Sequence, residues 1–90
     1  MKRIKTTQNF KIGLFFIDDN GTRVFNATFK TVAAAEKDAK EILLANYLWD
    51  REYLIAFVDN DNEITNVLYY VRLVLNDVHV PEFRLTAFSY

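Results

Sequence analysis

The stretch FKIGLFFIDDNGTRVFNATF, residues 10–29, decides the fold, because it has the pattern of two strands joined by a tight turn. Apolar residues alternate along residues 10–17, which is the period of a half-buried strand. DDNG, residues 18–21, favours a turn, since Asn and Gly tolerate positive φ angles. We therefore predict a β-hairpin whose second strand covers residues 23–29. The residues expected on one face of each strand are Phe10, Ile12, Leu14 and Phe16 in the first, and Phe25, Ala27 and Phe29 in the second.

A helix over residues 32–47 should follow the hairpin. Thr31 can cap it, because a threonine hydroxyl accepts a hydrogen bond from an unpaired N–H of the first turn. Glu36 and Lys40 lie four residues apart on the polar side, a spacing that supports a helix. One stripe at helical spacing would face a sheet: Val32, Ala35, Ala39, Ile42, Leu43 and Asn46.

Three further strands are predicted, over residues 53–58, 64–75 and 78–88. The segment 64–75 also has a helical interpretation, with Thr65 as a cap and with Val67, Val71, Val74 and Val78 at helical spacing. We favour a strand, because the segment is rich in β-branched and aromatic residues and follows an Asx-rich turn. Pro81 places the last strand at a sheet edge or a bulge, because proline cannot donate to a ladder.

The resulting order is β-β-α-β-β-β, an α+β fold in which an antiparallel sheet of about five strands packs on one helix. Ninety residues suit a single domain, 1–90. The apolar content of 51% and the net charge of −1 indicate a chain that folds rather than a disordered one.

The chain contains no cysteine, which excludes disulfides, zinc–thiolate sites and iron–sulfur clusters. A chain without disulfides fits a cytoplasmic protein. The basic start, residues 1–5, has no apolar segment after it, so we expect no secretory signal. The longest apolar run, Val67–Val71, is too short to span a membrane.

Residues that could do chemistry are few, so we predict a non-catalytic protein without cofactor or metal. The one serine, Ser89, and the one histidine, His79, would need an oxyanion hole and a fixed geometry to act together. The segment 59–63, DNDNE, imitates a calcium loop, but Ile64 stands where that loop needs glycine. The Asp18–Asp19 pair is better explained as part of a turn.

Apolar side chains exceed what one helix can cover. Residues 67–75 would place Val67, Tyr69, Val71, Leu73 and Leu75 on one face, and Leu68, Tyr70 and Val74 on the other. Large exposed apolar patches usually mark interfaces. Either a second layer within the chain covers this face or another chain does, and a two-fold homodimer is the simplest assembly.

The function that we predict is therefore protein binding: a small adaptor or inhibitor, of the compact kind that phages or mobile elements encode, which occupies the surface of another protein. Trp and Arg often dominate the energetics of interfaces, and aromatic residues are enriched there. The candidate partner-binding residues are Trp49, Tyr69, Tyr70 and Arg72.

Nucleic-acid binding is the alternative. Residues 1–40 carry eight Lys/Arg and four Asp/Glu, whereas residues 41–90 carry three and eight. Basic residues near aromatic ones can bind phosphates and stacked bases. The candidates are Lys2, Arg3, Lys5, Lys11 and Arg23. The pI of about 5.7 argues against this alternative, because nucleic-acid-binding domains are often strongly basic.

Overall fold

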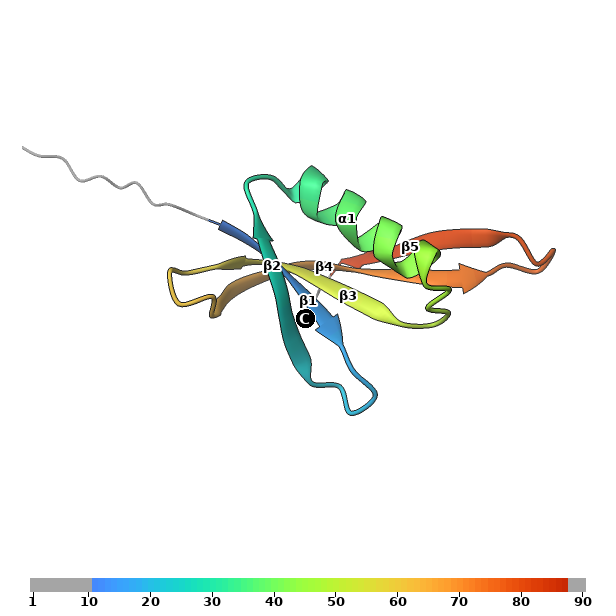
Figure 1. The fold of residues 1–90 in the computed structure, drawn as a ribbon, viewed down its shortest axis with the longest axis horizontal. Helices are drawn as coiled ribbons and strands as arrows, with labels where there is room; N and C mark the ends of the chain where they lie inside the picture. The colour runs from blue at the N-terminus through green and yellow to red at the C-terminus, as the bar shows by residue number, and fades with distance from the viewer. Residues whose placement is uncertain (1–10, 88–90) are drawn as a thin grey trace, which may run out of the picture.

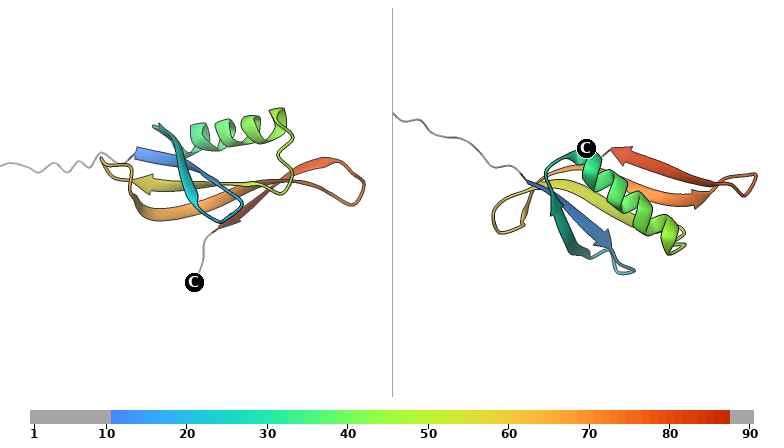
Figure 2. Two further views of the ribbon diagram at one scale, coloured as in Figure 1. Left: turned by 60° about the horizontal axis from the view of Figure 1, so that its bottom comes forward. Right: turned by 45° about the horizontal axis from the view of Figure 1, so that its top comes forward.

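The computed structural model describes residues 11–87, which form one helix and five strands. The strands make one antiparallel sheet in the order β2-β1-β3-β4-β5, and α1 lies across one face of it (Figures 1 and 2). The α+β prediction is confirmed, and so is the strand assignment of residues 64–75. The elements are β1 (Lys11–Ile17), β2 (Arg23–Phe29), α1 (Val32–Ala45), β3 (Glu52–Val58), β4 (Ile64–Leu75) and β5 (Pro81–Ala87).

One turn geometry joins all three hairpins within residues 11–87. In each turn the first side chain accepts hydrogen bonds from the backbone N–H groups two and four residues later. The residue in fourth position has a positive φ angle, as these turns require. This geometry uses the Asp59 carboxylate as a backbone acceptor, as the turn interpretation of residues 59–63 predicts. The three turns are Asp18–Thr22, Asp59–Glu63 and Asn76–Val80.

The third turn corrects one strand boundary. Residues 76–80 form the turn, so β5 begins at Pro81 rather than at residue 78. Pro81 is the first residue of an edge strand, where its missing N–H disturbs no ladder. Residues 10 and 88, the outer ends of two predicted strands, lie outside the described part.

The helix begins as predicted and ends two residues early. Thr31 Oγ1 accepts a hydrogen bond from the Ala34 N–H at 3.1 Å. At the other end, Tyr47 adopts a φ of 51°, and Leu48 N–H donates to Leu43 O at 2.9 Å. This is a Schellman motif, which stops a helix by a left-handed residue. In residues 11–87 no helix is long and apolar enough to cross a membrane.

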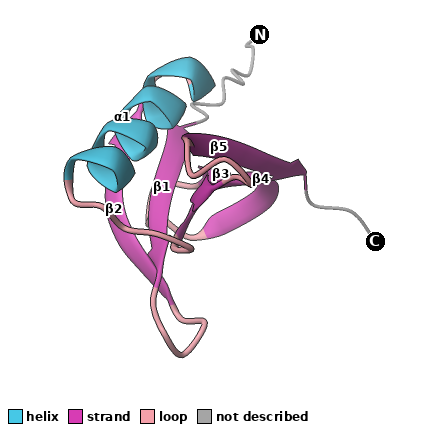
Figure 3. Cartoon of the chain, turned by 90° about the vertical axis from the view of Figure 1, so that its right-hand side faces the viewer, coloured by secondary structure: helices cyan, strands magenta, loops and turns pink. Residues whose placement is uncertain are grey.

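α1 lies over one face of the sheet (Figure 3). The larger hydrophobic core lies between the helix and this face. Three residues of α1 are fully buried against it: Ala35, Ala39 and Leu43. They meet inward-facing residues of the strands, namely Ile12, Leu14, Tyr53, Ile55, Val71 and Leu73. The small residues near the start of the helix and the leucine near its end follow the predicted stripe.

Two β-bulges correct the predicted faces. In β2 the pairing shifts from Leu14↔Ala27 to Phe15↔Phe25, so Phe25 lies on the face opposite Ala27. In β4 the pairing shifts between Ile55 and Ala56, which places Val67 on the face opposite Tyr69. An extra residue in one strand reverses the alternation beyond it. The predicted common faces of 25–29 and 67–75 were therefore wrong.

A polar contact joins the helix to the sheet. The Tyr69 hydroxyl donates to Glu36 Oε1, and Lys40 Nζ lies 2.7 Å from Glu36 Oε2. Lys40 also lies 5.5 Å from the centre of the Phe83 ring. Lys40 and then Tyr69 hold the pKa of Glu36 below its usual value of 4.5. Burial and this carboxylate raise the pKa of Tyr69.

We expect Tyr69→Phe to lower the free energy of unfolding by about 1–2 kcal/mol at pH 7, because it removes a hydrogen bond to a charged group. A carboxylate with a lowered pKa stabilises the fold above its unfolded-state pKa, and this stabilisation is lost as the pH falls. The difference between the two proteins should therefore shrink from pH 7 to pH 3, measured by urea unfolding. Tyr47→Phe is the control, since Tyr47 is 71% exposed. An equal difference at both pH values would contradict this assignment.

Candidate functional site

The sheet face opposite α1, which we call the helix-free face, has an apolar centre. A buried cluster runs across it, formed by Phe15, Leu54, Ala56 and Val58. Partly buried residues surround this cluster: Ile17, Ile64, Val67 and Tyr70. One face of an antiparallel sheet is commonly solvated and polar. This sheet instead has apolar residues on both faces.

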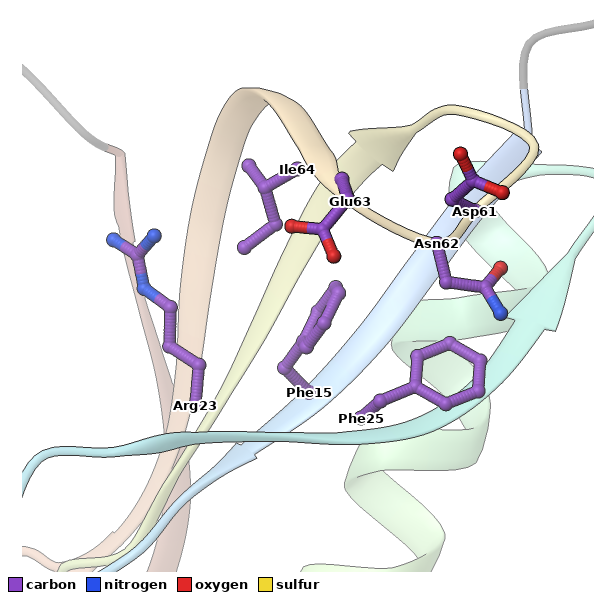
Figure 4. A pocket seen from close by; sticks show the side chains of 7 residues that line it. All are labelled: Phe15, Arg23, Phe25, Asp61, Asn62, Glu63 and Ile64. Carbon is purple, nitrogen blue, oxygen red and sulfur yellow. The ribbon is translucent and has the colours of Figure 1, made fainter.

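A groove of about 610 Å³ lies at one end of the helix-free face (Figure 4). Phe15 and Phe25 rise from the neighbouring strands β1 and β2, with their ring centres 5.6 Å apart in an edge-to-face arrangement. The β2 bulge is responsible, because it turns Phe25 to this side. The opposite wall is formed by Asn62 and Glu63 of the turn between β3 and β4, and by Ile64 at the start of β4.

Charged side chains border the apolar floor of this groove. Arg23 lies on one side, and Asp61 and Glu63 lie on the other. Among the described residues, neither of these two carboxylates takes part in an ion pair. The groove therefore combines aromatic surface with one cation and two free carboxylates. Such a border suits the polar rim of a protein interface better than a phosphate site.

A row of four charges crosses the far side of the helix-free face. Arg72 Nη2 lies 2.9 Å from Glu52 Oε2, and Arg84 Nε lies 3.0 Å from Glu82 Oε2. Arg72 and Arg84 are cross-strand partners, so two like charges stand opposite each other. Arg84 and then Asn76 lower the pKa of Glu82. The two carboxylates offset a pairing of like charges that would otherwise be unfavourable.

No family model, curated protein or solved structure matches this chain. Within residues 11–87, no three His, Asp or Glu side chains are grouped so that they could hold a metal ion.

The structure divides the four predicted partner-binding residues between the two faces. Tyr70 and Arg72 lie on the helix-free face, Tyr70 against the buried cluster and Arg72 beside Glu52. Tyr69 lies on the helix side, hydrogen-bonded to Glu36. Trp49 packs against the helix-side core near the end of α1 and forms a bridge to Leu73. The four residues therefore do not form one surface.

The residues predicted for nucleic-acid binding are partly outside the described chain. Lys2, Arg3 and Lys5 lie there. Lys11 and Arg23 both face the helix-free side, at opposite ends of the first hairpin. Along an extended strand that separation is about 20 Å. The described residues of the set therefore form no continuous basic path.

Sequence reasoning missed three residues of the helix-free face: Phe25, Ile64 and Val67. Regular alternation would place the side chains of Phe25 and Val67 on the helix side of the sheet. The bulges instead turn both side chains to the helix-free face. Asn26 lies at the bulge of β2, between Phe25 and Ala27. Regular alternation already places Asn26 on the more polar face with Thr28, so the residue types give no signal of the bulge.

Proposed function

We propose that this protein is a non-catalytic interaction module, a small cytoplasmic adaptor or inhibitor, that binds another protein through the helix-free face. The observation that supports it most is Phe25, a large aromatic side chain that stays 42% exposed beside the groove. Together with the half-buried Ile64, Val67 and Tyr70, it gives an apolar centre. Arg23, Asp61 and Glu63 supply a charged rim around that centre, the usual anatomy of a protein interface.

Nucleic-acid binding remains the second candidate, supported by the placement of Lys11 and Arg23 on the same face as Phe25. The carboxylates near Arg23 disfavour nucleic-acid binding, because Asp61 and Glu63 would repel a phosphate that approaches the groove. We therefore give preference to a protein partner.

The test compares two neighbouring substitutions on β2. Phe25→Asp places a charge on the helix-free face, and Val24→Asp places the same charge on the opposite face, at a residue that is similarly exposed (45%). Proteins captured from the source cells by the immobilised chain are quantified by mass spectrometry. We expect one protein to be retained by the wild type and by Val24→Asp, and to be reduced at least about tenfold by Phe25→Asp.

Equal retention by both variants, or no protein retained above an empty support, would refute the proposal. Retention that nuclease treatment abolishes would instead support the nucleic-acid alternative. Melting curves of both variants control for loss of the fold.

A further inference from the structure

The outer edge of β5 is regular and has no strand beside it in the described chain. β5 lies beside β4 at one edge of the sheet (Figure 1). The two strands pair through seven consecutive residues without a register shift. The other edge strand, β2, carries a bulge, which is one of the common ways to discourage edge pairing. The two edges therefore differ in their capacity to accept another strand.

The hydrogen-bond pattern shows which backbone groups of β5 are free. Asn76 N–H donates to Val80 O at 3.1 Å, and these two residues belong to the same ladder as Leu75↔Pro81. Hydrogen-bonded and non-hydrogen-bonded pairs alternate along an antiparallel ladder. Glu82, Arg84 and Thr86 therefore bond to β4. The alternate residues Phe83, Leu85 and Ala87 direct N–H and C=O groups outward, and Pro81 directs its C=O group outward.

We propose that two copies of this chain associate through β5, antiparallel about a two-fold axis, with Phe83 opposite Phe83 of the second copy. This inference uses the outer edge of β5 rather than the groove at Phe25, and it does not depend on the proposed function. It would continue the sheet across both chains, with four backbone hydrogen bonds. Each Phe83 would exchange bonds with the other, and each Leu85 N–H would donate to Pro81 O of the second copy.

Charge selects this register over its neighbours. With Phe83 on the axis, Glu82 stands opposite Arg84 of the second copy, so two ion pairs form on the helix-free side. Arg84 already bonds to Glu82 in its own strand, and its guanidinium keeps further donors available. A register centred on Arg84 would place arginine against arginine. One centred on Leu85 would leave Arg84 opposite an uncharged threonine.

The helix-side face of the same register is apolar. Leu85 is 47% exposed, and Pro81 is also exposed. The two-fold axis places Leu85 opposite Pro81 of the second copy, twice, beside the Phe83 pair. The β5 edge is therefore complementary to a second copy of itself: ion pairs form on the helix-free side, and apolar contacts form on the helix side. Neither requires a change in the fold.

The test reverses the charge of Glu82 or of Arg84 in separate variants. Dimer formation by each variant is measured by sedimentation equilibrium over a range of protein concentrations. We expect the wild type to dimerise at about 50 µM or below. Glu82→Arg and Arg84→Glu should each weaken the dimer at least about tenfold, because each sets like charges opposite each other. An equimolar mixture of the two variants should form a heterodimer, since every charge then meets its opposite.

A backbone variant tests the edge itself. Leu85→Pro removes an N–H that the β4 ladder does not use, so it should abolish the dimer, whereas Leu85→Ala keeps that N–H and should weaken it less. A wild type that is monomeric at about 500 µM would overturn the proposal. So would a dimer that both charge variants leave unchanged, or variants that stay monomeric when mixed. Melting curves confirm that each variant is folded.

Discussion

Leu54→Ala is expected to lower the free energy of unfolding by about 2–5 kcal/mol, although Leu54 lies on the sheet face that no helix covers. Its side chain is completely buried, between the cross-strand partners Phe15 and Tyr70. Truncation removes transfer free energy and leaves a cavity, because neighbouring strands hold the surrounding side chains in place. The melting temperature of a domain of this size should fall by more than about 10 °C.

The matched control is Leu44→Ala on α1, where the leucine is 43% exposed. We expect a change within about 0.5 kcal/mol there, because the exposed site leaves no cavity and alanine is a good helix former. The free energies of unfolding of both variants are measured by urea unfolding and compared with that of the wild type. Equal effects of the two substitutions would mean that the cluster on the helix-free face is not packed as a core.

Gly13→Ala is expected to destabilise the fold by about 1–3 kcal/mol, through overpacking. A Cβ atom at position 13 would lie 2.7 Å from Val58 Cγ1 and 2.8 Å from Phe15 Cε1. Valine has a stiff side chain, so it cannot easily move aside. In an ordinary strand the same substitution would stabilise, since glycine loses more backbone entropy on folding.

A double-mutant cycle identifies the cause. Val58→Ala removes the Cγ1 atom with which the new methyl group would clash. On its own, this substitution destabilises the fold because it leaves a cavity. If overpacking is responsible, the two substitutions together should cost less than the sum of the two alone, by about 1 kcal/mol or more. Additive effects, or a Gly13→Ala protein as stable as the wild type, would exclude the close contact as the cause.

The local features of the fold could be predicted from the sequence, because local chemistry decides them. Asp18-Asp19-Asn20-Gly21 places an acceptor and a left-handed residue where a hairpin turn needs them, and Thr31 caps the helix. The helix end could not be predicted in the same way. A tyrosine, Tyr47, takes the left-handed position that glycine usually occupies, so no residue type marks the stop.

The candidate site was harder to predict, because its strands contain three β-bulges, one in β2 and two in β4. Each bulge is set by how a whole strand fits its neighbour, and alternation of residue types does not indicate it. Phe25 and Val67 reach the helix-free face by this route. Residue type alone made Trp49 a candidate partner-binding residue, but the tertiary structure packs it against the helix-side core.

The strand order has a consequence for how the chain folds. Three of the four strand pairings in residues 11–87 join strands that are consecutive along the chain, and only β1 with β3 joins strands that the helix separates. Hairpins form in microseconds, and distant pairings wait for the closure of a long loop. We expect two early units, residues 11–29 and 52–87, whose docking along β1 and β3 is the slow step. No turn connects β1 to β3, so no turn sets the register of this pairing. The burial of the partners Leu14 and Ile55 must select it.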